Sequence, residues 1–290
     1  MLLEINWNLS PKIFELDAFM LAGKEFGPIE IRYYGLLFAL GFIIGQRILI
    51  HIFKKEGHPE SDVDTLTVYM VLATVIGARV GHYVFYEYPL IAKMGLGKWL
   101  LEMITPPFSG LASHGAIFSI FVALYFYART KTNQSYLWIT DRMAITVAFA
   151  GFCIRMGNFM NSEILGKPTD LPWGVNFMQD SEYLRGFYAL TPRHPAQLYE
   201  SLSCLVLFFV MMYIWNKYKE KTPTGLLTGL FMIWVFTLRF FYEFIKENQT
   251  VYEEGMKLNT GQLLSIPAVL FGISLWYFGS KWDKKEKYNQ

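Results

Sequence analysis

The chain has 290 residues, of which 53% are hydrophobic, 18% aromatic and only 17% charged, and its mean hydropathy is +0.27. Soluble domains carry about a quarter charged residues, so this composition excludes an ordinary soluble protein and indicates a polytopic membrane protein. Lysine and arginine total 26 against 24 acidic residues, which leaves no basic excess for nucleic acid. Two cysteines, Cys153 and Cys204, lie in apolar stretches and fit neither a disulfide framework nor a metal site.

The first thirty residues carry charges throughout, among them Glu4, Lys12 and Glu25. These charges interrupt any signal-peptide apolar core. We therefore expect residues 1–30 to form an extracytoplasmic N-terminal arm, and the first spanning helix to act as an uncleaved insertion signal.

A transmembrane helix needs about twenty mostly apolar residues. Seven stretches qualify, namely 31–52, 63–87, 110–128, 139–157, 196–215, 225–244 and 260–279. The sequence thus predicts an all-α integral membrane protein with about seven transmembrane helices. We expect residues 31–280 to form the transmembrane domain, with a small extracytoplasmic cap at 158–195 between helices 4 and 5. Residues 281–290 form a basic tail.

Lysine and arginine are concentrated in the short connections after the first, third and fifth segments and in the tail, where Lys281, Lys284, Lys285 and Lys287 lie. The longer connections carry cations more sparsely, mixed with acids. By the positive-inside rule the short loops are cytoplasmic. This places the N-terminus outside and the C-terminus in the cytoplasm.

Ionisable groups in hydrocarbon are costly, so they are candidates for a functional site. In the predicted orientation, the polar groups of six or seven helices fall in the outer leaflet although the helices alternate in direction. Independent snorkelling residues would divide between both interfaces. The outer group contains no lysine and comprises Tyr34, Arg79, His82, His114, Arg155, Asn158, Glu163, His194, Gln197, Glu200, Arg239, Glu243 and Gln262.

Ordinary structural roles explain some of these residues. A structural ion pair accounts for Arg79 or Glu243, taken singly, as well as chemistry does. Snorkelling accounts for four residues at the predicted cytoplasmic ends, which are Arg47, His51, Asp141 and Arg142. The convergence at one depth is what indicates a site. Because the arginine guanidinium stays charged and its planar fork matches phosphate oxygens, this site favours an anionic phospholipid.

One string, Arg155-Met-Gly-Asn-Phe-Met-Asn-Ser-Glu163-Ile-Leu-Gly166, resembles the signature of the bacterial phosphatidylglycerol–prolipoprotein diacylglyceryl transferases. Six further strings recur in the expected order: Ile31-Arg-Tyr-Tyr-Gly35, Gly77-Ala-Arg79, Ser113-His114-Gly115, His194-Pro-Ala-Gln-Leu-Tyr-Glu200, Arg239-Phe-Phe-Tyr-Glu243 and Gly261-Gln-Leu-Leu-Ser265. The resemblance spans about Ile31 to Pro267. The sequence departs from the family's usual glycine at Ile154, glycine at Ala116, and serine or threonine at Ala196, and no departure removes a charged group or the histidine.

The resemblance implies that diacylglycerol moves from phosphatidylglycerol to the lipobox cysteine of a prolipoprotein signal peptide, forming a thioether and releasing glycerol phosphate. It implies an enzyme of the bacterial inner membrane that needs no metal or cofactor. The reacting thiol must lose its proton, and the charge on the leaving phosphate must be stabilised by cations.

We assign roles within this chemistry to nine residues. Histidine changes charge near neutral pH, so His114 is the candidate general base, with Glu200 or Glu243 as the alternative. Arg155 and Arg239 hold the phosphate. The other expected contributors are Tyr34 and Asn158 as neutral donors, Glu163, Glu200 and Glu243 as groups that orient the arginines, and Arg79 in lipid binding.

Three other classes of membrane protein fit less well. A transporter or flippase for anionic lipids needs polar groups that continue toward the cytoplasm, and few lie there. A retinal-type receptor needs a lysine in the seventh helix, and 260–279 contains none. An intramembrane protease needs a serine–histidine or paired-aspartate arrangement, and neither is evident.

Overall fold

The computed structural model describes residues 5–21, 24–105, 112–132, 134–247 and 257–288. The chain divides into two compact units. The first unit comprises Met1–Leu49 and Asp141–Trp282, and the second comprises Ile50–Thr140 and Asp283–Gln290.

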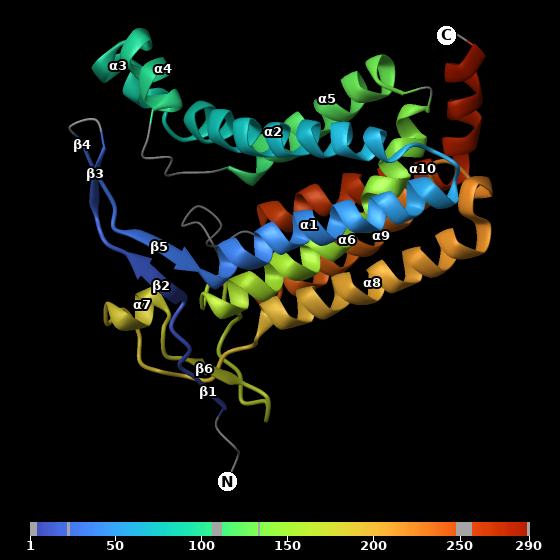
Figure 1. The fold of residues 1–290 in the computed structure, drawn as a ribbon. Coiled ribbons are helices and arrows are strands. Elements are labelled where there is room, and N and C mark those ends of the chain that lie inside the picture. The colour runs from blue at the N-terminus through green and yellow to red at the C-terminus, as the bar shows by residue number, and fades with distance from the viewer. Residues whose placement is uncertain (1–4, 22–23, 106–111, 133, 248–256, 289–290) are drawn as a thin grey trace. The chain divides into compact units, whose positions relative to one another are not determined.

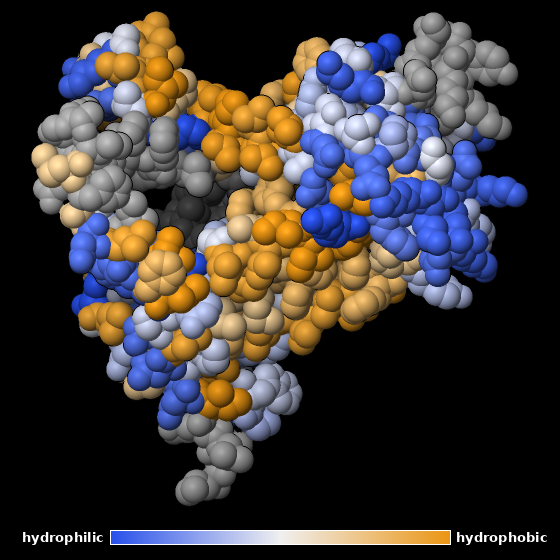
Figure 2. Space-filling view, in the orientation of Figure 1, coloured by the Kyte–Doolittle hydropathy of each residue, from blue (hydrophilic) through white to orange (hydrophobic). Residues whose placement is uncertain are grey.

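Most of the first unit is built from long apolar helices that run alongside one another (Figure 1). They are α1 (Tyr33–Lys55), α6 (Tyr136–Met160), α8 (Ala196–Tyr218), α9 (Leu226–Tyr242) and α10 (Thr260–Tyr288), with a 3-10 turn, η2 (Lys219–Lys221), after α8. Apolar side chains cover the middle of α8, and hydrophilic residues gather toward its ends (Figure 2). This distribution suits a helix surrounded by hydrocarbon.

The start of α9 is fixed by a buried carboxylate on α6. Asp141 is fully buried, and it accepts hydrogen bonds from the backbone N–H groups of Gly225 at 2.7 Å and Thr228 at 2.8 Å. It also accepts the Thr228 hydroxyl at 2.7 Å. These are the N–H groups that a helix start leaves without intrahelical partners. The snorkelling explanation for Asp141 and Arg142 is therefore wrong, because both side chains are completely buried.

The second unit is organised by the close crossing of α2 (Glu60–Phe85) and α5 (Ser113–Thr130), with η1 (Tyr88–Leu90), α3 (Ile91–Met94) and α4 (Leu96–Ile104) between them in sequence. Glycines permit this crossing. A Cβ on Gly115 would lie 2.2 Å from the Gly77 carbonyl oxygen and 2.6 Å from the Gly81 Cα. Such small residues let two helix backbones approach closely in a membrane.

Each of the seven predicted segments corresponds to a helix in the structure. Within the part of the chain that the structure describes, five of these helices are long and apolar enough to cross a membrane, namely α1, α2, α6, α8 and α10. Helices α5, with 18 residues, and α9, with 17, are shorter. The structure therefore supports a mostly helical, multi-pass integral membrane protein.

The segment between α6 and α8 folds around a small apolar core of its own. Phe159, Leu165, Val175 and Phe177 are buried there, and Trp7 from the N-terminal segment packs against them. Strand β1 (Ile5–Trp7) pairs in parallel with β6 (Val175–Phe177). Helix α7 (Ser181–Leu184) follows, and its first N–H groups are capped by Asp180.

The rest of the N-terminal segment forms two antiparallel pairs. Strand β2 (Lys12–Leu16) pairs with β5 (Ile29–Arg32), and β3 (Phe19–Leu21) pairs with β4 (Lys24–Phe26). No strands are predicted in this arm from the sequence. The pairing of β1 with β6 makes strand β1 an integral part of the folded segment that precedes α8 (Figure 1).

Candidate active site

The last turn of α6 and the loop after it carry the first group of predicted residues. Arg155 Nη1 donates to Asn158 Oδ1 at 3.3 Å, and Asn158 Nδ2 donates to Glu163 Oε2 at 3.2 Å. Asn161 Nδ2 donates to the other carboxylate oxygen, Glu163 Oε1, at 3.0 Å. A continuous series of hydrogen bonds therefore runs from the guanidinium through one amide to an exposed carboxylate.

The backbone around Glu163 adopts an unusual conformation. Ser162 and Ile164, on either side, have φ angles of 53° and 59°. The left-handed region is unfavourable for non-glycine residues and most of all for a β-branched one, at a cost on the order of 1–3 kcal/mol each. Hydrogen bonds from Glu163 N to Asn158 O (2.9 Å) and from Gln197 Nε2 to Glu163 O (2.5 Å) fix this conformation.

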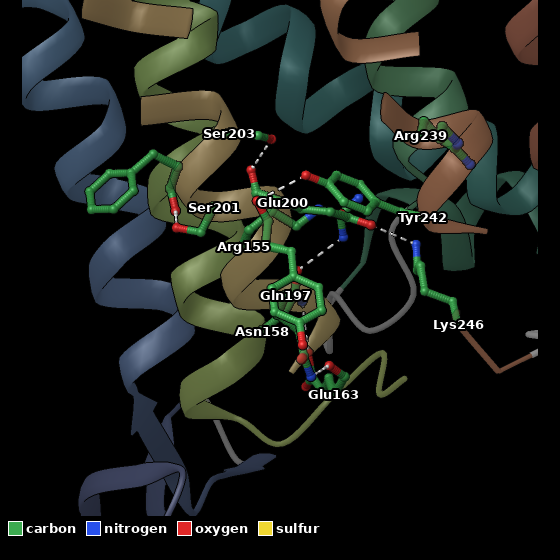
Figure 3. Close-up of polar contacts among 12 residues, drawn as sticks. Arg155, Asn158, Glu163, Gln197, Glu200, Ser201, Ser203, Arg239, Tyr242 and Lys246 are labelled. Atoms are coloured by element: carbon green, nitrogen blue, oxygen red, sulfur yellow. Dashed lines mark hydrogen bonds and ion pairs between the residues drawn. The ribbon is translucent and has the colours of Figure 1, made fainter. Parts of the chain in front are cut away.

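A chain of alternating charges joins α6, α8 and the end of α9. Arg155 Nε forms an ion pair with Glu200, and Lys246 Nζ lies 2.9 Å from the other Glu200 oxygen, Oε1 (Figure 3). Lys246 Nζ also lies 3.4 Å from Glu243 Oε1, and Arg239 Nε lies 3.7 Å from the same oxygen. Three cations thus alternate with two carboxylates.

Lys246 corrects the prediction that the site contains no lysine. Lys246 is only 3% exposed, and its Nζ contacts the carboxylates of both Glu200 and Glu243. Buried charges persist only when they are paired, and Lys246 supplies the charge that lets Glu200 and Glu243 approach one another. The guanidinium groups at the two ends are more accessible, with side-chain exposures of 27% for Arg155 and 44% for Arg239.

The start of α10 supports Glu243 from a third side. Asn259 Nδ2 donates to Glu243 Oε2 at 2.9 Å. Asn259 and Gln262 hydrogen-bond each other reciprocally, backbone N–H to side-chain oxygen, at 3.0 and 2.9 Å. A Cβ on Gly261 would lie 3.0 Å from the Glu243 carboxylate. Residues at the start of α10 therefore hold the Glu243 carboxylate at the end of α9 in place.

Tyr34 lies beside the end of α6. Its ring is 2.9 Å from the position that a Cβ on Gly157 would occupy, so the glycine of the signature makes room for it. The first unit thus brings together seven of the predicted residues, which are Tyr34, Arg155, Asn158, Glu163, Glu200, Arg239 and Glu243.

The remaining two predicted residues belong to the second unit. The Ala112 N–H donates to the Ala78 carbonyl at 2.9 Å, which joins the segments that carry His114 and Arg79. His114 is exposed on the first turn of α5. Arg79 is buried, and it donates from Nε to the Met103 carbonyl at 2.9 Å and from Nη2 to the Glu102 carbonyl at 3.1 Å. These contacts tie α2 to the end of α4.

Titratable groups also mark the folded segment before α8. The Gly166 N–H donates to the His194 carbonyl at 3.1 Å, which joins the end of the signature to the string that starts α8. Burial lowers the pKa of His194, favouring its neutral form. Burial, together with the hydrogen bond that it donates to Asp180, raises the pKa of Tyr188.

The family model described as prolipoprotein diacylglyceryl transferase matches residues 23–278 of the chain. A phosphatidylglycerol–prolipoprotein diacylglyceryl transferase of Chloroherpeton thalassium is 39% identical over 285 residues, covering 98% of this chain and 97% of the relative. Relatives of the same name from Tolumonas auensis and Bacteroides fragilis are 38% identical, covering 95% and 97% of this chain and 97% of each relative. The chain belongs to the prolipoprotein diacylglyceryl transferase family.

In this member of the diacylglyceryl transferase family, four residues to which the sequence assigns no role also support the site. Lys246 links the two carboxylates, Asn161 and Gln197 fix Glu163, and Asn259 supports Glu243. Asn161 lies inside the signature and Gln197 within the predicted outer-leaflet group. The sequence therefore contained an indication that each belongs to the site. Lys246 and Asn259 lie just outside predicted helices and read as loop residues.

Proposed function

We propose that the protein transfers the diacylglyceryl group of phosphatidylglycerol to the lipobox cysteine of a prolipoprotein signal peptide. The cysteine thiolate attacks the diacylglycerol carbon that is bonded to the phosphate oxygen. A carbon–sulfur bond forms, the carbon–oxygen bond breaks, and its electron pair leaves with glycerol phosphate. The thiol proton passes to a general base.

The observation that carries this proposal is the chain of alternating charges in the first unit, in a protein that belongs to this family. It comprises Arg155, Glu200, Lys246, Glu243 and Arg239. Arg155 and Arg239 each keep an accessible guanidinium while one nitrogen is oriented by a buried glutamate. Preorganised cations of this kind stabilise charge that develops on a leaving phosphate. Asn158 and Tyr34 supply neutral donors beside Arg155, and Glu163 contributes to headgroup binding. Phosphatidylglycerol is the donor and the signal peptide the acceptor.

His114 is the general base in this proposal. Glu200 and Glu243, the alternatives, are each paired with Lys246, whereas His114 is exposed. The role proposed for Arg79 is in lipid binding. Two of its hydrogen bonds hold carbonyls of α4, and a third reaches the Tyr83 hydroxyl within α2.

The proposal includes the topology. Seven helices cross the bacterial inner membrane within residues 31–280, the N-terminus lies outside, and the basic tail 281–290 lies in the cytoplasm. Residues 1–30 and 158–195 form the extracytoplasmic arm and cap. The pairing of β1 with β6 supports placing the arm and the cap on the same side.

A direct assay tests the function. Purified protein is incubated with phosphatidylglycerol and a lipobox peptide, and the peptide cysteine is examined by mass spectrometry for a diacylglyceryl increment. We expect the increment with phosphatidylglycerol and none with phosphatidylethanolamine, because the arginines select an anionic headgroup. A peptide that stays unmodified with phosphatidylglycerol refutes the proposed reaction, and equal transfer from both lipids refutes headgroup recognition.

A further inference from the structure

Glu163 differs from the other two carboxylates of the site. The side chains of Glu200 and Glu243 are only 11% and 8% exposed, and both are ion-paired with lysine and arginine. Glu163 is exposed, and among the described residues it forms no ion pair. The side chains that hold it are the neutral amides of Asn158 and Asn161. A carboxylate that is held by amides and left accessible does not position an arginine through an ion pair.

The backbone around Glu163 is strained, and it fixes the position of this residue. Two left-handed residues, Ser162 and Ile164, bracket Glu163, and hydrogen bonds fix its N–H and its carbonyl. Strained backbone of this kind persists where the surrounding structure imposes it, and it is concentrated at ligand sites. Figure 3 shows Glu163 at the lower edge of the cluster, below Asn158 and Arg155.

The chemistry of the group limits what it binds. An ionised carboxylate only accepts hydrogen bonds, and its two oxygens offer about four acceptor positions. Two of these are taken by Asn158 and Asn161, so about two remain. The amide oxygens of Asn161 and Gln197 are buried and have no hydrogen-bond partner among the described residues. The spare acceptor positions that a ligand can reach are those of the exposed Glu163 carboxylate, whose charge repels a phosphate.

Glu163 is separated from Arg155 by one side chain, through two successive hydrogen bonds. A lipid phosphate on Arg155 therefore carries its headgroup into reach of Glu163. We propose that Glu163 selects the donor lipid by accepting hydrogen bonds from hydroxyl groups of the headgroup, so that the site takes hydroxyl-bearing anionic phospholipids and discriminates against anionic phospholipids without a hydroxyl. This inference rests on the proposed transferase function.

The test compares two donors of equal charge, phosphatidylglycerol and phosphatidylethanol, which lacks the headgroup hydroxyls. Both are presented to the full-length protein in the same detergent micelles with a lipobox peptide, and kcat/KM is measured for each. A buried site that hydrogen-bonds a substrate hydroxyl rejects the analogue without it by about 10⁴- to 10⁵-fold. For an exposed carboxylate we expect the wild-type protein to prefer phosphatidylglycerol by at least about tenfold.

Glu163→Gln removes the charge and replaces one acceptor oxygen by a donor. We expect its preference to fall toward one, through a loss with phosphatidylglycerol and little change with phosphatidylethanol. Glu182→Gln, at an exposed carboxylate of α7, is the matched control and keeps the wild-type ratio. An equal loss for both donors in Glu163→Gln overturns the inference, because a purely structural residue behaves in that way.

The wild-type ratio tests the inference even if Glu163→Gln does not fold. A wild-type ratio near one overturns hydroxyl recognition while leaving the proposed transferase function intact. Absence of any transfer from phosphatidylglycerol by the wild-type protein refutes the proposed function instead. The two failures are therefore distinguishable.

Discussion

Lys246 sits between two carboxylates that would repel each other without it. We expect Lys246→Met to lower the stability of the protein by about 3–5 kcal/mol, the usual cost of breaking a buried ion pair by removing one partner. Lys246→Arg keeps the charge and costs much less. Thermal unfolding in detergent measures the difference, with Lys217→Met at an exposed lysine as the control. If Lys246→Met is as stable as the wild type, the ion pairs of Lys246 with Glu200 and Glu243 do not stabilise the protein.

Arg155 uses two different nitrogens, Nε toward Glu200 and Nη1 toward Asn158. A lysine cannot make both contacts, although it keeps the charge. We expect Arg155→Lys to reduce the rate of transfer from phosphatidylglycerol about a hundredfold, equivalent to losing about 3 kcal/mol of transition-state stabilisation. Arg79→Lys is the comparison, and we expect a smaller loss of turnover. Near-normal turnover in Arg155→Lys would make that arginine a packing residue and leave Arg239 to hold the phosphate.

His114→Gln tests the general base. Glutamine keeps hydrogen bonding but cannot transfer a proton, so we expect a loss of roughly a hundred- to ten-thousand-fold in rate near neutral pH. The residual rate should rise with pH as the peptide thiol, with a pKa of about 8.5, ionises without help. The measurement is a pH–rate profile for both proteins. Normal turnover in His114→Gln would move the base role to Glu243 or Glu200.

At the scale of the helices, Asp141 holds the start of α9, the helix that carries Arg239 at its other end. We expect Asp141→Ala to destabilise the protein by about 1–3 kcal/mol, since a helix cap is lost and buried N–H groups are left unpaired. Asp141→Asn keeps one acceptor and should cost less. Thermal unfolding is the measurement, with exposed Glu220→Gln as the control. Equal stability of Asp141→Ala and wild type would show that the cap contributes nothing.

The helices themselves follow from the sequence, because runs of about twenty apolar residues have no alternative to helix in hydrocarbon. The contacts between them do not. From the sequence, Lys246 is an interfacial lysine that follows a predicted helix. Its ion pair with Glu200 of α8 is visible only in the structure. Asp141 reads as a snorkelling residue because its partner, Gly225, is 84 residues away. Partner choice between distant helices depends on tertiary packing, which hydropathy does not encode.

In the candidate site, too, the sequence predicts the residues that are close along the chain but not the contacts between distant ones. The signature placed Arg155, Asn158 and Glu163 together, because they lie within one helix end and its loop. The sequence could not foresee that Glu163 is held by amides, while Glu200 and Glu243 are held by cations. That distinction depends on which side chains the strained loop and the facing helices bring within reach. The strands of the N-terminal arm were missed because segments of three to five residues carry too little pattern.

For the whole molecule, the distribution of lysine and arginine between the connections predicts the orientation. A reporter fused after Gln290 should give a cytoplasmic signal, and one inserted within residues 170–188 should give an exported signal. Paired alkaline phosphatase and fluorescent protein fusions in a bacterial host make the measurement. Reversed signals at both positions would overturn the orientation and place the site in the opposite leaflet.

The pairing of β1 with β6 has a consequence for biosynthesis. Asn6 and its partner Asn176 are 170 residues apart, and a ribosome that adds about 5–20 residues per second needs roughly 10–30 s to cover that distance. During this interval the first strand is made but has no partner, and an open strand edge invites incorrect pairing. Strand β1 therefore gains its partner late, after α6 has emerged. A tag placed ahead of Ile5 would interfere with a late step of assembly rather than with the first insertion.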